Sequence, residues 1–192
     1  MLSKSATKKM TRSITVSYPR SGSNFLQNVL RKTCKQGALS IYSENVASSG
    51  AVNFKSHAPN PVYLRDEVQR LLGTDLDQER VKICWLVRDP RDVMVSFYEY
   101  SRSRLKMEID QETFCTNFDW FLAAPIDRSC MRKVLQAPIS AMGAYKMHIN
   151  TWMHEWRQGG VQQFRYEELV SNPESTFSRL FKFLDTDQDG EL

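Results

Sequence analysis

The chain has 192 residues, a formal net charge of +4, 41% hydrophobic residues and 25% charged residues. This balance is typical of a soluble globule with one domain and a short appendage, and it excludes a disordered, collagen-like or coiled-coil chain. The longest uninterrupted apolar run, Ile83 to Val87, is too short to span a bilayer, and the basic first residues lack the apolar stretch of a secretory signal.

Strands and helices are expected to alternate along the chain, which predicts an α/β fold of three layers with a mostly parallel central sheet flanked by helices. In the first half, strands are expected at 13–17, 39–42 and 52–56, and helices at 24–36 and from Pro61 onward. In the second half, strands are expected at 81–87 and 161–166, and helices at 90–104, 140–158 and 173–184. Residues 106–139 have no regular pattern and contain two prolines, so this stretch is predicted to be irregular.

The segment 140–158 has the clearest amphipathic pattern, and its apolar side chains are expected to face the core rather than a cofactor. These elements predict a domain at 12–185 between a basic tail at 1–11 and an acidic tail at 186–192. The acidic residues from Asp185 onward resemble the first half of a calcium-binding loop. The chain ends before the glutamate that such a loop needs, so calcium binding is not expected.

The cysteines and histidines do not indicate a metal site. Four cysteines lie far apart without a CxxC pair, and we expect reduced thiols in a cytoplasmic protein. The three histidines do not complete a zinc cluster with them. The mild positive charge suits an anionic ligand and does not by itself indicate a nucleic-acid partner.

A tight turn joins the first strand to the first helix, with the sequence Tyr18-Pro19-Arg20-Ser21-Gly22-Ser23. Backbone N–H groups at a helix start bind anions, and the small residues and Arg20 would add donors and positive charge. The alternative is an ordinary turn capped by Ser23 or Asn24. The Walker A pattern is absent, which argues against a nucleoside triphosphatase or a kinase of that class.

Lys55-Ser56-His57 follows at the end of another strand. A histidine there could take a proton from a hydroxyl, and the lysine could neutralise developing negative charge. Alternatively, both side chains are ordinary surface residues.

Arg88-Asp89-Pro90-Arg91-Asp92-Val93 ends the most apolar strand, and Ser96 lies further along the following helix. Ligands of parallel α/β sheets bind at the carboxyl ends of strands, which favours a binding role for Arg88. The alternative is a salt-bridged junction between strand and helix.

In this order, the three motifs resemble the sulfotransferases, which use 3′-phosphoadenosine-5′-phosphosulfate (PAPS). The cytosolic members read YPKSGTTW, KTH and RNPKDVAVS at the corresponding places. The segment 143–156 is similar to their WGSWxDHVxxWW helix, and Phe164 to Leu169 is similar to their RYEDL motif. The resemblance covers about residues 12–185 and implies a P-loop NTPase-like fold.

The resemblance also implies roles for individual residues. His57 corresponds to the general base, Lys55 to a group that assists transfer, and Arg20 to the cation at the leaving oxygen. The implied PAPS-binding residues are Arg20, Ser21, Gly22, Ser23, Asn24, Phe25, Arg88, Ser96 and Tyr166. Arg88 and Ser96 correspond to ligands of the 3′-phosphate, and Phe25 and Tyr166 to residues near the adenine. No metal is implied.

The acceptor is expected to be a small molecule, a carbohydrate or a lipid-like alcohol. Its pocket is expected to include an apolar wall from Phe114, Phe118, Trp120 and Phe121, which could equally belong to the core. Family members continue to a basic RKGxxGxW segment that closes on the 3′-phosphate, and this sequence stops before it. We therefore keep a second hypothesis, a catalytically silent nucleotide-binding module.

Overall fold

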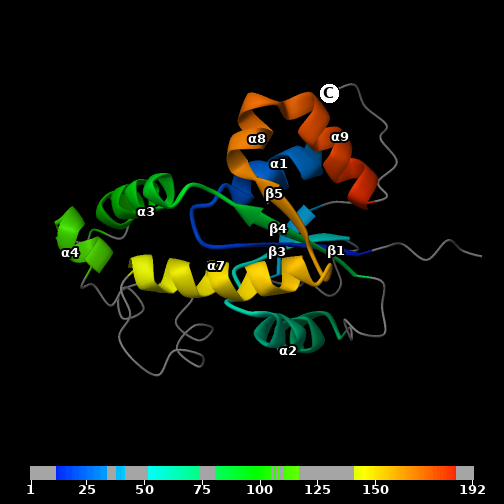
Figure 1. Cartoon of the computed structure of the whole chain (residues 1–192), viewed down its shortest axis with the longest axis horizontal. Coiled ribbons are helices and arrows are strands. Elements are labelled where there is room, and N and C mark those ends of the chain that lie inside the picture. The colour runs from blue at the N-terminus through cyan, green and yellow to red at the C-terminus, as the bar shows by residue number, and fades with distance from the viewer. Residues whose placement is uncertain are drawn as a thin grey trace, which may run out of the picture.

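The computed structural model describes residues 12–33, 38–41, 52–73, 81–104, 106, 108, 110–116 and 141–184. Its centre is a sheet of five strands in the order β2-β3-β1-β4-β5 (Figure 1). The strands are β1 (Ser13–Ser17), β2 (Ala38–Ser40), β3 (Asn53–Ser56), β4 (Lys82–Val87) and β5 (Gln162–Arg165). All neighbouring strands are parallel, so the predicted α/β architecture is confirmed.

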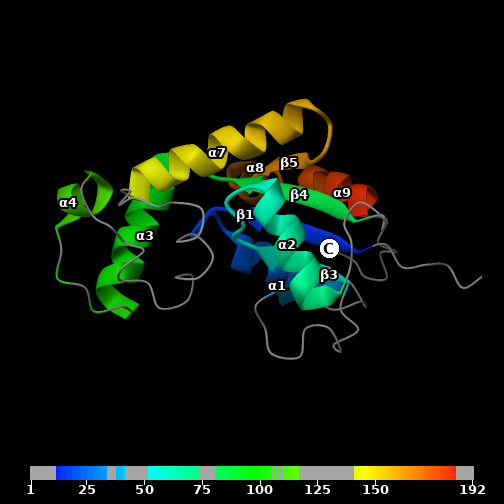
Figure 2. The same ribbon diagram turned by 90° about the horizontal axis from the view of Figure 1, so that it is seen from below.

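Helices cover both faces of this sheet. The described helices are α1 (Ser23–Thr33), α2 (Pro61–Leu72), α3 (Pro90–Arg104), α4 (Gln111–Thr116), α7 (Ala141–Arg157), α8 (Tyr166–Ser171) and α9 (Pro173–Leu184). Figure 1 shows α1, α8 and α9 on one side of the sheet and α2 and α7 on the other. Both views place α3 and α4 beyond the strands, at one end of the molecule (Figure 2).

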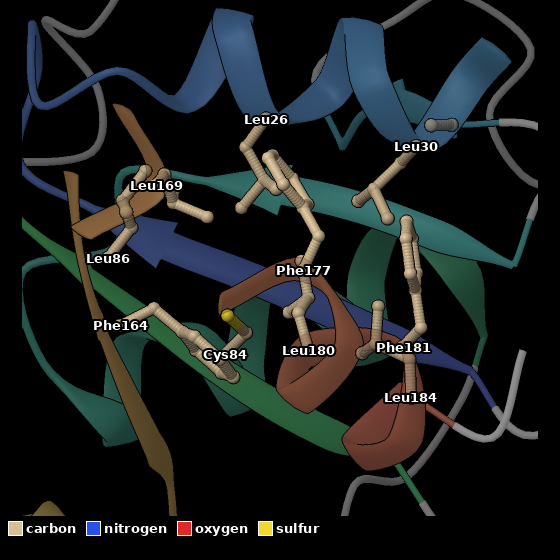
Figure 3. Packing of buried hydrophobic residues seen from close by; sticks show 11 residues of the cluster. Leu26, Leu30, Cys84, Leu86, Phe164, Leu169, Phe177, Leu180, Phe181 and Leu184 are labelled. Carbon is tan, nitrogen blue, oxygen red and sulfur yellow. The ribbon is translucent and has the colours of Figure 1, made fainter. Parts of the chain in front are cut away.

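Two buried clusters hold these layers together. On one face, Leu26 and Leu30 of α1 meet α9 side chains such as Phe177 above Cys84 and Leu86 of β4 (Figure 3). On the other face, the cluster joins β1, β3 and β4 to α2 and α7 through Ile14, Val16, Phe54, Trp85, Leu64, Val68 and Trp152. Because alternate β4 residues enter opposite clusters, the continuous apolar run of this strand is explained by helices on both faces.

Several element boundaries shift from the predicted ranges by one or two residues, and three differences affect the description of the site and the core. Residues 111–116 form the short helix α4, within a stretch predicted to be irregular, and Phe114 is fully buried there against Phe97. Tyr166 begins the helix α8, whereas it was predicted to end a strand. α1 starts one residue early, at Ser23, and is described as far as Thr33.

Some predictions fall on residues outside the described ranges. These are both predicted tails and the acceptor-wall candidates Phe118, Trp120 and Phe121. Phe114, the fourth candidate, lies in the core. No helix in the described part of the chain is long and apolar enough to cross a bilayer.

Candidate functional site

The three sequence motifs follow strands that end at the same edge of the sheet. In the parallel register Val16 is level with Ser56, and Ser17 is level with Leu86. The turn after β1, His57 after β3 and Arg88 after β4 therefore emerge side by side. β5 ends at Arg165, level with Val87, so Tyr166 emerges at this edge as well. This is where ligands bind in open parallel sheets.

The turn after β1 has a backbone shape that depends on its sequence. Gly22 has φ +93°, a left-handed conformation that favours glycine, and Arg20 also lies in the left-handed region with φ +69°. The Ser21 N–H donates to the carbonyl oxygen of Tyr18 at 3.2 Å and closes the turn. A Cβ atom on Gly22 would stand 2.2 Å from the ring of Tyr166, so only glycine fits this approach.

The helix α1 begins directly after this turn. Ser21 and Ser23 are buried, and the Leu26 N–H makes its helical bond to the carbonyl oxygen of Gly22 at 3.1 Å. The N–H groups that precede Leu26 in the first turn have no helical acceptor and lie at the positive end of the helix dipole. The turn therefore offers donors and positive potential to an anion.

Arg20 connects the first and third motifs. Its Nε donates to Ser96 Oγ on α3 at 3.2 Å, and its guanidinium lies 4.8 Å from the ring centroid of Tyr100. The arginine side chain is therefore directed along α3, with its backbone in the β1–α1 turn.

Arg88 lies at the other side of the same turn. Its Nη1 donates to the carbonyl oxygen of Arg20 at 3.2 Å, and its guanidinium stacks 4.6 Å from the ring centroid of Tyr166. Asp92 is 3.8 Å away, and Arg88 Nε is buried without a hydrogen-bond partner. A buried guanidinium donor with no acceptor is the kind of group that an oxyanion would satisfy.

The backbone of Arg88 is fixed from α7. The Tyr145 hydroxyl donates to the carbonyl oxygen of Arg88 at 2.6 Å. Burial, with the charges of Asp89 and Glu167, raises the pKa of Tyr145 to about 12, so this hydroxyl stays protonated and remains a donor.

An aromatic surface adjoins the two arginines. Phe25 is 39% exposed, and its ring meets the Tyr166 ring edge-on with 6.0 Å between centroids. The ring of Phe177 of α9 also lies near Phe25, with 6.3 Å between centroids. An exposed aromatic ring beside cationic groups suits the base of a nucleotide.

Lys55 and His57 lie at the end of β3. Lys55 Nζ donates to Oδ1 of Asn24 in the first turn of α1, which brings the second motif next to the turn after β1. His57 Nδ1 lies 2.8 Å from the carbonyl oxygen of Ser17. A carbonyl only accepts, so Nδ1 carries the proton in the neutral ring and Nε2 is its basic nitrogen.

His148 of α7 was not identified from the sequence as a functional residue. It is buried, its ring centroid lies 5.9 Å from that of Tyr18, and its Nε2 has no hydrogen-bond partner. Burial, with a smaller contribution from the charge of His57, lowers the pKa of His148 to about 3. His148 is therefore a neutral imidazole beside the candidate base.

The structure thus brings all the predicted site residues to one edge of the sheet. Sequence reasoning missed Tyr100, Tyr145 and His148, which support the site from α3 and α7. The amphipathic pattern of 140–158 places Tyr145 among the core-facing side chains, and only its hydroxyl indicates a second role. Within the described residues, no group of three or more His, Cys, Asp or Glu side chains is placed to hold a metal ion.

In a comparison with protein families, the model of the sulfotransferase domain matches residues 10–192. The 3-beta-hydroxysteroid sulfotransferase of guinea pig (Cavia porcellus) is 24% identical over 180 residues, which cover 89% of this chain and 58% of that protein. Human sulfotransferase 2A1 is also 24% identical over 180 residues, with the same shares covered. The chain therefore spans less than two thirds of the length of these curated relatives.

Two solved sulfotransferase structures have a similar fold. Mouse sulfotransferase SULT7A1, complexed with PAP, matches with a TM-score of 0.59 and 19% identity over 94% of this chain and 61% of that chain. A sulfotransferase from Alicyclobacillus acidocaldarius matches with a TM-score of 0.56 and 13% identity, covering 94% of this chain and 83% of that one. The expected P-loop NTPase-like architecture is thereby confirmed.

Proposed function

The chain belongs to the sulfotransferase domain family, and from that membership we propose that it binds PAPS and transfers its sulfuryl group to a hydroxyl or amine acceptor. The observation that carries the proposal is the buried Arg88 Nε without an acceptor, next to the anion-binding turn and the Phe25–Tyr166 aromatic pair. One nucleotide with phosphates at both ends of its ribose would engage all three features.

The described residues fit such a nucleotide in charge and in shape. The turn from Ser21 to Asn24 would hold the 5′-phosphate through backbone N–H groups and hydroxyls. Arg88 would hold the 3′-phosphate, together with Ser96, by charge-assisted hydrogen bonds. Phe25 and Tyr166 would contact the adenine. The close approach of Tyr166 to Gly22 supports this assignment, because it places the ring next to the phosphate turn.

When bound, PAPS supplies an activated sulfuryl group and a phosphate leaving group. We assign His57 Nε2 to remove the acceptor proton, since the bond from Nδ1 to Ser17 leaves the lone pair on Nε2. Lys55 would balance negative charge on the transferring oxygens, and Arg20 would balance the charge that the leaving phosphate oxygen gains. Arginine stays protonated, so Arg20 acts as a fixed charge and not as a general acid.

We propose a small-molecule acceptor and a cytoplasmic location. Two of the similar proteins are named as hydroxysteroid sulfotransferases, which makes a 3-hydroxysteroid a reasonable first probe. Cys84 is a buried free thiol, which fits a reducing compartment.

Binding and transfer are tested in two steps on the 192-residue chain. In the first, PAP at a hundred times its dissociation constant should raise the melting temperature by about 5–10 °C, and ATP should raise it less. The absence of a PAP shift at saturating concentration would overturn the proposal.

In the second step, ³⁵S-labelled PAPS is offered with a 3-hydroxysteroid and with 4-nitrophenol. Labelled product from either acceptor supports the enzyme. A clear PAP shift without transfer to any member of a broad phenol, steroid and amine panel supports the alternative, a silent nucleotide-binding module.

A further inference from the structure

The segment that carries His57 is held by a buried hydrogen-bond network. Ser56 Oγ donates to Glu67 Oε2 of α2 at 2.8 Å, and the same hydroxyl accepts from the Ala58 N–H at 2.9 Å. On the opposite side, Trp152 Nε1 of α7 donates to the Ala58 carbonyl oxygen at 3.0 Å. The residues before and after His57 are therefore anchored by two different helices.

Glu67 is an unexpected residue at its position. It is 2% exposed and lies among the apolar residues that α2 presents to the sheet, next to the fully buried Val68. A buried carboxylate is unfavourable unless it is well paired, and an apolar side chain of similar volume is often at least as stabilising. The partner of Glu67 is Ser56, which lies one residue before the candidate base His57. The carboxylate can therefore hold the segment that carries the base.

We propose that Glu67 is a positioning residue that, through Ser56 and Ala58, holds the His57 imidazole in the orientation with Nδ1 protonated and Nε2 basic. The His57 ring reaches back to the Ser17 carbonyl at 2.8 Å, a contact that depends on where the backbone at residue 57 lies. The catalytic consequence rests on the proposed sulfotransferase function. The effect of Glu67 on the orientation and tautomer of the His57 ring is independent of that function.

The tautomer of His57 gives a test that is independent of activity. Long-range ¹H–¹⁵N spectra report which nitrogen of each imidazole carries the proton, and the chain has only three histidines, which single substitutions assign. In the wild type we expect His57 to be protonated at Nδ1. In Glu67→Met, which keeps the volume and removes the acceptor, we expect a mixture of tautomers.

Two further variants separate positioning from general loss of structure. Glu67→Gln keeps an oxygen that accepts from Ser56, so it should retain the wild-type tautomer. Asp66→Ala removes a neighbouring carboxylate that is exposed on the same helix, and it should also leave His57 unchanged. If Glu67→Met does not fold, Ser56→Ala removes the bridging hydroxyl instead and should give the same mixture of tautomers.

Retention of the wild-type tautomer in folded Glu67→Met, or in Ser56→Ala where the first variant is unfolded, would overturn the proposal. Kinetics provide the second readout. For Glu67→Met we expect kcat to fall by roughly ten- to hundredfold with PAP affinity within about twofold of wild type, because misplacing a catalytic group has this kind of effect. An altered tautomer with unchanged kcat would confirm that Glu67 positions the His57 ring and would overturn the catalytic consequence of that positioning. If the wild-type protein has no transfer activity, the proposed function is overturned. The proposal for Glu67 is then still tested by the spectra, which report the tautomer of His57 without any activity.

Discussion

Arg20 and Ser96, 76 residues apart in the chain, share a hydrogen bond of 3.2 Å that joins the turn after β1 to α3. Because of this bond, the guanidinium at the proposed leaving-group position is held on α3, by Ser96 and by the ring of Tyr100. Ser96 and Arg20 are therefore coupled, and both would respond to a nucleotide bound beside them.

Replacing Arg20 should affect both binding and chemistry. In Arg20→Ala we expect kcat to fall by about 10²–10³-fold, as for loss of one group that stabilises developing charge, and PAP affinity to fall by about tenfold. Arg20→Lys should recover most of the activity. Steady-state kinetics and PAP titrations measure both quantities. A folded but inactive Arg20→Lys would show that a simple positive charge is insufficient here.

His57→Ala should reduce turnover far more than nucleotide affinity. A positioned base contributes about 10²–10⁴-fold to the rate, whereas PAP has no proton for His57 to remove. The exposed His154 provides a matched control, and His154→Ala should leave kcat near wild type. Near-normal turnover in His57→Ala would remove this residue from the catalytic role.

Arg88 should provide the preference for a nucleotide with a 3′-phosphate. One charge-assisted hydrogen bond contributes about 1.5–3 kcal/mol, so wild type should bind PAP at least about tenfold more tightly than adenosine 5′-phosphate. In Arg88→Ala this ratio should fall toward one. Competition titrations of the two nucleotides measure it. An unchanged ratio in Arg88→Ala would assign the 3′-phosphate to other residues.

Gly22→Ala should weaken both the fold and PAP binding. The left-handed backbone and the contact with Tyr166 together should lower the free energy of unfolding by about 1–3 kcal/mol. Gly159→Ala is the control, because Gly159 has φ +77° but no atom within 4 Å of the added Cβ. Urea unfolding and PAP titration compare the two variants. Equal losses would mean that the approach of Tyr166 is unimportant.

His148 should make the fold sensitive to mild acid. The unfolded chain binds a proton at this histidine near its ordinary pKa of about 6.5, whereas the folded chain binds it only near pH 3. Lowering the pH through this window therefore favours the unfolded state, by about 2 kcal/mol at pH 5 relative to pH 7.

This effect of pH can be isolated by substitution. In His148→Phe the loss of unfolding free energy between pH 7 and pH 5 should be about 2 kcal/mol smaller than in the wild type. His154 is exposed, so His154→Gln should behave as wild type. Urea titrations at both pH values provide the measurement. A His148→Phe protein with the full wild-type loss would assign the acid sensitivity elsewhere.

The fold was largely predictable because its strands and longer helices have strong local patterns. β4 was recognised from its continuous apolar run, and α7 from apolar residues at helical spacing. The helices α4 and α8 have six residues each, less than two turns, so they leave too few repeats for a periodic signal.

The site was predictable at the level of its motifs but not of its contacts. Parallel strands bring the three motifs to one edge, so their proximity followed from the fold class. Arg20 and Ser96 lie 76 residues apart in the chain. Their hydrogen bond depends on the conformation of the arginine side chain, which the sequence does not specify. Glu67 was missed because a single glutamate on an amphipathic helix resembles a solvent-exposed residue in sequence.

The strand order determines when, during synthesis, the residues of the proposed nucleotide site are all present. β1 is central in the sheet and is the first of the five strands to be made, and Arg88, which contacts Arg20, lies 68 residues downstream of that residue. Glu167, which accepts from the Asp89 N–H, is made a further 78 residues after Asp89. A nascent chain therefore carries the turn after β1 well before Arg88 and Glu167 have been made. We expect nucleotide to stabilise ribosome-bound chains only after α8 has left the exit tunnel, and such non-local pairing to make refolding slow.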